Sequence, residues 1–393
     1  MKVIFKTFHA ANGDCIFFTL KEADKQFTIM VDCGRYSKPI KDYVENQLNK
    51  HIDLLVVTHI DVDHIEGVTK MLNDMPDLSI DEIWFNSYKR SNDGDILPLS
   101  EKQIVCLKRL YNKIPQVIDV LDTKANADHA MTLSETILGN PKWKSVWIRE
   151  RIRVNMEDYP LCDGVLGKIR ILSPTQKDLN DLDEEFLALF YEFFYGEHSE
   201  NNLDKDSTIY ELLLRVAHEN DIVDQIDSEQ IASQILDEQV IIDYSGNKTS
   251  PLTPANKASI AFVWELDEHK VLFLGDASPD VVSKSLNGLY GTGNTLFDAV
   301  KVSHHGSAHS TTIKMMEKID SPHFFFTGGG GNKRPHIEAI SRIICRPLQQ
   351  GVNSRMLHFN YKNEWTEGLE KDELQKRFCY SIDYNSNELT YEF

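Results

Sequence analysis

A continuous run of buried-type residues, Leu54-Leu55-Val56-Val57-Thr58, is the feature that most restricts how this chain can fold. A strand without an alternating polar face is covered on both sides, as in a sheet that packs between other layers. The run leads directly into the segment His59-Ile60-Asp61-Val62-Asp63-His64. Because a loop at a strand end lets several polar side chains converge, we expect a layered α/β protein with a site at this strand end.

Further short strands are expected on both sides of this run, where apolar or alternating stretches are bounded by Gly, Asn and Asp turns. They cover residues 3–8, 15–20, 27–31, 83–85, 147–154, 168–172, 259–265, 271–275, 298–302 and 323–327. Helical patterns occur at 40–50, beyond Gly67, at 100–112 and at 131–139. Residues 380–384 and 389–393 flank Asn385-Ser386-Asn387, which predicts a C-terminal hairpin.

Most of the negative charge of the chain lies in one segment. Residues 178–238 hold 18 Asp or Glu against Lys205 and Arg215, and therefore carry −16 of the net charge of −19. Apolar residues recur in this segment at helical spacing. We therefore predict a first half of the main domain at 1–177, an acidic helical insertion at 178–250, and a second half with the C-terminal hairpin at 251–393. The nearly neutral remainder has no basic stripe of the kind that dominates non-specific nucleic-acid binding.

The strongest chemical signal is a group of four potential metal ligands within six residues. His59, Asp61, Asp63 and His64 combine imidazole and carboxylate, a set that suits Zn, Mn or Fe. Two pairs of ligands can hold two adjacent ions, which together activate a water and clamp the attacking and leaving oxygens. The alternative is a solvated acidic loop with incidental histidines, since short motifs produce false positives.

The stretch 58–67 resembles the HxHxDH signature of the metallo-β-lactamase fold, with Asp61 in place of the second His. This variant is similar to the hydrolase domain of ComEC-type DNA-uptake proteins and their soluble stand-alone relatives. Further resemblances follow in the same order along the chain: 12–15 (NGDC), 31–34 (VDCG), 256–260 (NKASI), 272–276 (LFLGD), 301–307 (KVSHHGS) and His336 after a Gly-rich loop. The resemblance implies a four-layer αβ/βα sandwich of the α/β (α+β) class, here with a helical insertion.

The resemblance also implies roles for residues. His59 and Asp61 would bind one metal, Asp63 and His64 the other, and Asp276 would bridge the two. His304 or His305 would complete the second site, and the sequence leaves open which one does. His129 is a candidate for a further ligand that many family members have.

Other residues are expected around the metals. Asp14 and Asp32 would orient ligating histidines, although turn aspartates that cap backbone N–H groups are an equally good interpretation. The role of His336 is open, because Pro335 precedes it and inverts the family pattern. Lys301, Ser307, His309, Lys333 and Arg334 are expected near the mouth of the site, where they could meet an anionic substrate or simply be solvated.

The function that these residues predict is a metal-dependent hydrolase that uses a metal-bound hydroxide and two divalent ions, Zn or Mn. Asp63 would orient the water, and His305 or His336 would protonate the leaving group. The resemblance favours a phosphodiester substrate, and therefore a nuclease or nucleotide phosphodiesterase. The charge distribution favours a small or short phosphodiester, such as single-stranded nucleic acid, over long duplex DNA.

Two alternatives remain open, because this fold supports many chemistries. The chain could hydrolyse a carboxylic ester or lactone. It could instead be a component of a multi-protein bacterial system, such as anti-phage defence, that binds a protein partner through the acidic insertion. The six scattered cysteines, the strand-like N-terminus and the lack of an apolar run long enough to cross a bilayer predict a cytoplasmic protein with no membrane partner.

Overall fold

Two large β-sheets form the centre of this computed structural model, which describes residues 1–87, 132–148, 150–194, 210–211, 213–214, 236–246, 250–329, 334–384 and 388–392. The first sheet has six strands in the order β16-β1-β2-β3-β4-β5. They are β1 (Lys2–Thr7), β2 (Ile16–Glu22), β3 (Lys25–Val31), β4 (His51–Val57), β5 (Ser79–Phe85) and β16 (Glu388–Glu392). Strands β3, β4 and β5 run parallel, so the apolar run at 54–58 lies inside a sheet as predicted.

The second sheet has eight strands in the order β15-β14-β13-β11-β9-β8-β7-β6. They are β6 (Tyr159–Pro160), β7 (Lys168–Ser173), β8 (Ala261–Leu266), β9 (His269–Phe273), β11 (Ala299–Lys301), β13 (His323–Phe326), β14 (Arg355–Phe359) and β15 (Tyr380–Asp383). The strands from β9 to β15 run parallel, and β6, β7, β8 and β9 alternate in direction. A separate parallel pair joins β10 (Thr295–Leu296) to β12 (Ile319–Asp320).

The two large sheets pack face to face through a common apolar cluster. Phe5 of the first sheet lies 5.5 Å from Phe273 and 4.3 Å from Phe325 of the second, measured between ring centroids. Phe18 lies 5.3 Å from the ring of Trp264. These side chains are all fully or almost fully buried, so the alternating strand residues of both sheets meet in one core.

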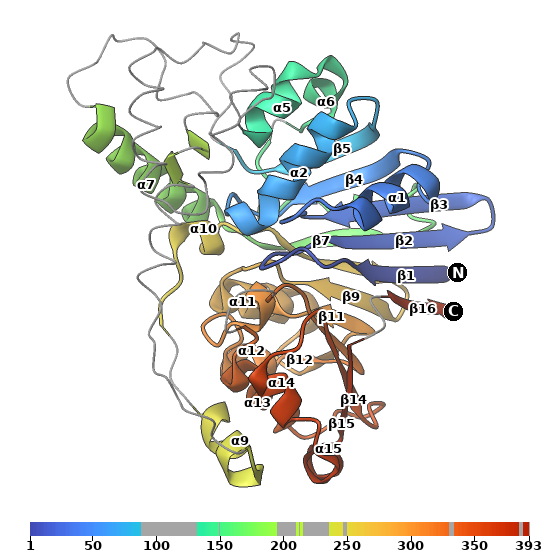
Figure 1. The fold of residues 1–393 in the computed structure, drawn as a ribbon, viewed down its shortest axis with the longest axis vertical. Coiled ribbons are helices and arrows are strands. Elements are labelled where there is room, and N and C mark those ends of the chain that lie inside the picture. Colours follow the sequence, from blue (N-terminus) through green and yellow to red (C-terminus); the bar gives the residue numbers. More distant parts are fainter. Residues whose placement is uncertain are drawn as a thin grey trace.

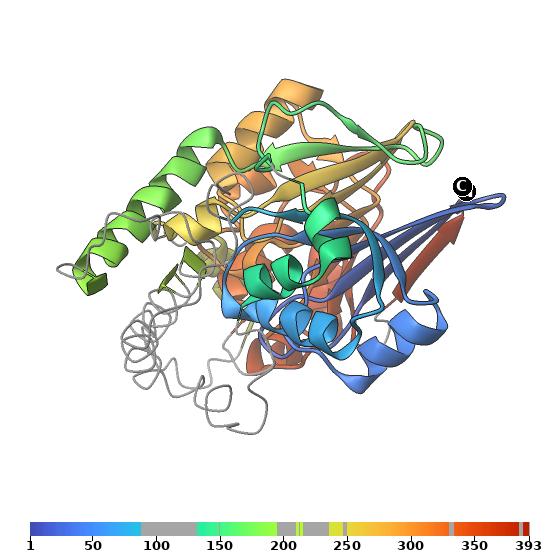
Figure 2. The same cartoon turned by 90° about the horizontal axis from the view of Figure 1, so that it is seen from above.

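Helices cover the outer face of each sheet (Figure 1). The core outside the first sheet includes residues of α1 (Lys38–Asn46), α2 (Val62–Asp74), α5 (Leu133–Gly139), α6 (Pro141–Val146), α7 (Gln176–Phe194) and α10 (Pro254–Lys257). The core outside the second sheet includes residues of α9 (Glu238–Ser245), α11 (Pro279–Tyr290), α12 (Ile313–Met316), α13 (Ile337–Ile344), α14 (Glu364–Gly368) and α15 (Asp372–Phe378). Figure 2 gives the same arrangement from above. The predicted mixed α/β class is therefore confirmed.

Two predicted elements differ in the structure. Among the described residues of 147–154 there is no strand, because Trp147 ends α6 and makes only an isolated bridge to Ile83. Trp147 and Ile152 are apolar because they fill the cores beside β5, not because they extend a sheet.

The predicted C-terminal hairpin is also wrong. β15 pairs with β14 in the second sheet, whereas β16 pairs with β1 and forms the edge of the first sheet. Tyr380 accordingly packs in the outer core of the second sheet, and Leu389 packs against the core between the sheets. A local turn pattern cannot reveal that the two strands belong to different sheets.

The described parts of the acidic segment pack against both halves of the molecule. Helix α7 begins two residues before the predicted boundary at 178, and its Leu179, Leu182 and Phe186 are buried in the core of the first sheet. Tyr210, Leu213 and Leu214 join the same core. Helix α9, near the end of the segment, contributes Ile241 to the core of the second sheet.

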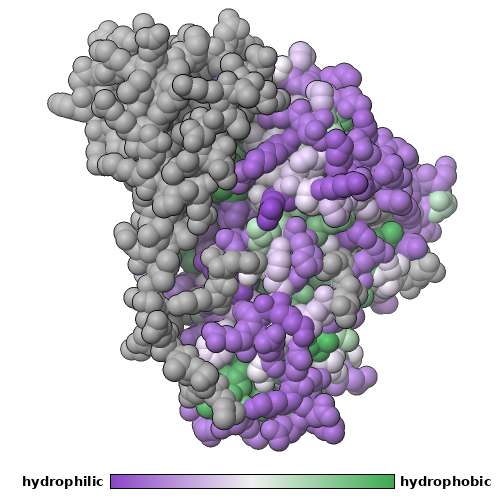
Figure 3. All heavy atoms as spheres, viewed as in Figure 1, coloured by the Kyte–Doolittle hydropathy of each residue, from purple (hydrophilic) through white to green (hydrophobic). Residues whose placement is uncertain are grey.

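The surface of the described residues carries few large apolar side chains. Val165, Ile242, Leu296 and Ile313 are exposed, and they come from separate elements. The described part of the face in Figure 3 is mainly hydrophilic, with small scattered apolar areas. Of the helices in the described ranges, none combines the length and apolar character that crossing a bilayer requires. Cys15, Cys33, Cys162, Cys345 and Cys379 are free thiols.

Candidate metal centre

The candidate metal-binding residues lie at one edge of the molecule, where the ends of several strands meet. The loop after β4 carries His59 and Asp61, and Asp63 and His64 lie in the first turn of α2. Asp276 follows β9, and His304 and His305 lie in the short turn η2 (Ser303–Gly306) after β11. Since parallel strands end at the same edge of a sheet, residues far apart in sequence meet here.

The first group of polar atoms surrounds one oxygen of Asp276. Its Oδ2 lies 3.8 Å from Nε2 of His59, 3.6 Å from Nε2 of His64 and 3.3 Å from Nε2 of His304. His59 Nε2 also lies 3.3 Å from Oδ2 of Asp61. The residues that the resemblance assigned to the first metal and to the bridge thus converge with His64 and His304.

The second group forms around Asp63, and His64 belongs to both groups. Oδ1 of Asp63 lies 3.8 Å from His64 Nε2, and its Oδ2 lies 3.3 Å from His305 Nε2. The two adjacent histidines of η2 therefore face different carboxylates: His304 faces Asp276, and His305 faces Asp63. Both His304 and His305 therefore face the centre.

Two carboxylates contact imidazole rings on the side that faces away from the centre. Asp32 Oδ2 lies 2.8 Å from Nδ1 of His64, and the same carboxylate accepts hydrogen bonds of 2.7 Å from both N–H and Oγ1–H of Thr58. Asp14 Oδ1 lies 3.0 Å from Nδ1 of His305. Because Nδ1 is occupied in each ring, Nε2 is turned toward the centre, which is the arrangement that orients histidine ligands of metals.

The inward-facing atoms lack hydrogen-bond partners although they are buried. This holds for Nε2 of His59, His64 and His305. Oδ1 of Asp276 is also buried without a hydrogen-bond partner, and it lies on the side of Lys301. Buried polar atoms without partners are rare in folded proteins, and imidazole nitrogen with carboxylate oxygen is a common donor set for divalent cations. His59, His64 and Asp276 form one group that could hold a metal ion, and Asp63, His64 and His305 form another.

The buried carboxylates and imidazoles of the centre also shift each other's pKa values. Burial by itself would raise the pKa of the Asp276 carboxyl, but His304 and His64 hold this pKa well below its usual range. Burial would likewise lower the pKa of His64, yet Asp276 and Asp32 keep it well above the usual value. Asp276 and His64 thus stabilise each other's charged forms, and the buried Lys301 lies beside Asp14 and Asp276.

Several residues of the centre adopt backbone conformations that non-glycine residues seldom have. Asp32 has φ 57°, His304 has φ 51° and His305 has φ 54°. Such left-handed conformations persist only where surrounding contacts enforce them, and they are frequent at functional sites. Here the two successive left-handed residues allow neighbouring histidines to face different carboxylates.

Polar residues that the sequence interpretation missed support the ligands. Besides its bonds to Asp32, Thr58 places its Oγ1 3.0 Å from Nδ1 of His59. Ser259 Oγ accepts a bond from the backbone N–H of Asp276, and Ser310 Oγ lies 3.3 Å from Nδ1 of His304. Thr327 Oγ1 donates to Asp14. Thr58 and Ser259 had a sequence signal, since Thr58 directly precedes the first ligand and Ser259 belongs to the stretch 256–260 that resembles the family.

The predicted substrate-contacting residues have different outcomes. Lys301 and Ser307 are buried, so the prediction that they lie at the mouth is wrong; both have internal hydrogen-bond partners instead. Arg334 is half-buried, and no carboxylate pairs with it in the part of the chain that the structure describes. Lys333 and His129 lie outside the described residues.

Two histidines beyond the ligand set support the loops around η2. His336 precedes α13, and its Nδ1 accepts a hydrogen bond of 3.2 Å from the backbone N–H of Ala308. His309 Nδ1 accepts a bond of 2.8 Å from the N–H of Ser250, which lies at the end of the acidic segment. These bonds connect the loop after η2 to α13 and to the returning acidic segment.

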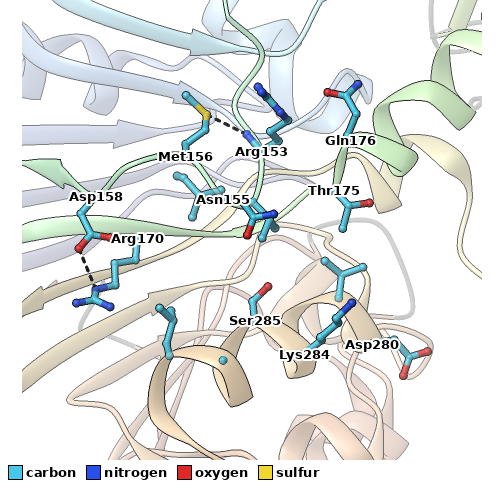
Figure 4. Close-up of a pocket in the computed structure, with 15 residues that line it drawn as sticks. Arg153, Asn155, Met156, Asp158, Arg170, Thr175, Gln176, Asp280, Lys284 and Ser285 are labelled. Atoms are coloured by element: carbon cyan, nitrogen blue, oxygen red, sulfur yellow. Dashed lines mark hydrogen bonds and ion pairs between the residues drawn. The ribbon is translucent and has the colours of Figure 1, made fainter.

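A separate cavity of about 880 Å³ lies between the loop at 153–156, the end of β7 and α11 (Figure 4). Lys284 and Asp280 of α11 line one side, and Asn155 and Arg170 line the other. None of the candidate metal residues lines this cavity. The cavity is therefore not the candidate centre itself.

Comparisons of the sequence with protein-family models and with curated proteins return no match.

Proposed function

We propose that this chain is a metal-dependent hydrolase with a metallo-β-lactamase-type sandwich, and that it cleaves a phosphodiester. The observation that carries the proposal is the convergence of Nε2 atoms from His59, His64 and His305, without hydrogen-bond partners, on the carboxylates of Asp63 and Asp276. His64 belongs to both groups, as in a centre for two adjacent ions.

His59, Asp61, Asp276 and His304 would hold one ion, and Asp63, His64 and His305 the other, with Asp276 between them. The mixed nitrogen and oxygen donors suit Zn, and the share of carboxylate makes Mn a rival. Divalent ions in such a centre act as Lewis acids on a phosphoryl group and on water.

Asp63 is the best candidate to orient the attacking water. Its side chain is 26% exposed, whereas those of Asp276 and His305 are almost completely buried. Solvent therefore reaches the centre on the Asp63 side, where a carboxylate oxygen can accept a proton from water. His305 lies between Asp14 and Asp63, which favours a ligand role over proton donation. The half-buried His336 is then the candidate to protonate the leaving group.

A cationic group close to His304 favours an anionic substrate over a neutral ester. Burial and then the Arg334 guanidinium lower the pKa of His304 well below its usual value, so this guanidinium acts on the centre. A half-buried guanidinium that has no carboxylate partner among the described residues fits a phosphodiester oxygen better than a lactone.

The experiment is metal analysis of the purified protein combined with hydrolysis of bis-p-nitrophenyl phosphate, p-nitrophenyl acetate and a lactone. We expect bound divalent ions and a preference for the phosphodiester. Asp63→Asn should lower that rate by at least about 100-fold, because Asp63 would both hold an ion and orient the water, and even residues that only support metal ligands contribute up to about 100-fold. Asp77→Asn, an exposed aspartate paired with Lys50, is the control and should leave the rate unchanged.

A chelator should abolish turnover, and Zn²⁺ or Mn²⁺ should restore it. A protein that holds no divalent ion, or turnover that survives Asp63→Asn, would refute the proposal. Preferential turnover of the acetate or the lactone would refute the phosphodiester assignment alone.

A further inference from the structure

We propose that Lys301 is a positioning residue that orients the carboxylates of Asp14 and Asp276, so that each presents a single oxygen to the candidate metal ligands. This inference rests on the proposed metal-dependent function and deepens it. It replaces the role at the mouth of the site that the sequence suggested for this lysine.

Lys301 is enclosed in the molecule. It is the last residue of β11, its relative exposure is 1%, and its Nζ donates to the carbonyl oxygen of Gly275 at 3.2 Å. A buried ammonium is costly unless charged and polar partners surround it. Asp14 and Asp276 are the charged partners, and the carbonyl oxygen of Gly275 is the polar one.

The first carboxylate that Lys301 contacts is that of Asp14. The ammonium forms an ion pair with Oδ2, and the other oxygen, Oδ1, lies 3.0 Å from Nδ1 of His305. Thr327 Oγ1 donates to the same Oδ1. With Oδ2 held by the lysine, Oδ1 remains directed at His305, whose Nε2 then faces Asp63.

The second carboxylate is that of Asp276. Its Oδ1 lies 3.9 Å from Lys301 Nζ and has no hydrogen-bond partner, whereas its Oδ2 faces the three imidazoles of His59, His64 and His304. The lysine charge thus lies on the Oδ1 side and leaves Oδ2 as the oxygen available for metals. Lys301 therefore links the two groups of ligands from outside the centre.

The test compares the metal affinity of the wild type with that of Lys301→Met, which has similar length and no charge. Zn²⁺ stoichiometry is measured by elemental analysis, and affinity by competition with a chromophoric chelator. The visible spectrum of the Co²⁺-loaded protein reports the ligand set, which a merely structural role of the lysine would not change. Lys168→Met is the matched control, because Lys168 pairs with Asp158 in the same sheet and away from the centre.

We expect Lys301→Met to weaken Zn²⁺ binding by about 10- to 100-fold and to alter the Co²⁺ spectrum, the range typical of residues that orient metal ligands. Lys301→Arg should restore part of the affinity, because it keeps the charge. Lys168→Met should match the wild type in both measurements. Circular dichroism in the presence of chelator checks that each variant is folded.

If Lys301→Met does not fold, Lys301→Gln decides the question, since it keeps a donor for Asp14 but lacks the charge. Wild-type affinity and spectrum in the folded variant would overturn the proposal for Lys301 and leave the hydrolase proposal intact. A wild-type protein that binds no divalent ion would overturn both.

Discussion

Asp63 is held through its backbone as well as through its side chain. A Cβ placed on Gly13 would lie 1.5 Å from the carbonyl oxygen of Asp63, and one placed on Gly34 would lie 2.1 Å from it. The turns that carry Asp14 and Asp32 therefore approach the start of α2 as closely as a backbone without side chains permits. The glycine in each turn thus leaves room for the backbone of Asp63, while the aspartate in the same turn orients a histidine.

Gly13→Ala should displace Asp63 and weaken metal binding, because the overlap is with backbone and not with a flexible side chain. We expect the free energy of unfolding to fall by more than about 1 kcal/mol. Chemical denaturation and chelator competition measure the two effects. Gly139→Ala is the control, since a Cβ there meets nothing within 4 Å; its stability should be unchanged or slightly raised. Equal behaviour of the two variants would rule out the steric argument.

Among the elements, α7 changes how the acidic segment is understood. Its inner face is buried, with Phe186 4.9 Å from the ring of Tyr210. Arg151 forms a bidentate ion pair with Asp183 of this helix, with Nη2–Oδ1 and Nη1–Oδ2 distances of 2.8 and 2.9 Å. The described part of the segment therefore packs into the core as an integral part of the fold. A partner that docks on α7 would contact the outward, acidic face of this helix.

Phe186→Ala should lower the free energy of unfolding by about 3–5 kcal/mol, because it removes a fully buried ring from a packed core. Lys177→Ala on the exposed face of the same helix should change it by less than about 0.5 kcal/mol. Urea titration monitored by circular dichroism distinguishes the two results. A tolerated Phe186→Ala would mean that the helix is only loosely attached.

At the scale of the whole molecule, stability should depend on pH through a buried histidine in the second sheet. His358 of β14 stacks on Phe325 of β13, with 4.3 Å between ring centroids, and contacts Asp383 of β15. Burial and the neighbouring His323 lower the pKa of His358 from 6.5 to about 4. The folded state thus keeps this ring neutral at a pH where the unfolded chain would bind a proton.

The free energy of unfolding should therefore fall as the pH decreases from about 6.5 to about 4, by up to about 3 kcal/mol from this residue. Its contribution is complete above pH 6.5, since the folded pKa is depressed. Denaturation at several pH values should show a shallower dependence in His358→Gln than in the wild type. His51→Gln, which changes an exposed histidine, should keep the wild-type dependence. Parallel curves for all three proteins would contradict the assignment.

Local patterns in the sequence were sufficient for many of the described strands and for identifying the candidate ligands. The buried run before His59 specified a central strand, and the turns at Asp14, Asp32 and Asp276 specified where the other strands end. These features depend on neighbouring residues, so a single sequence contains them. The strand pattern at 147–154 failed because buried apolar residues can also cover the edge of a sheet without joining it.

Only the tertiary structure decided which of these residues meet. Asp14 is separated from Lys301 and Thr327 by hundreds of residues, yet it forms an ion pair with the first and accepts a hydrogen bond from the second beneath the centre. The different partners of His304 and His305, the burial of Lys301 and the separation of β15 from β16 likewise depend on how distant strands pair. A sequence pattern indicates which face of a helix or strand is apolar. The burial of a particular side chain and its ion pairs depend on which other parts of the fold pack against that face.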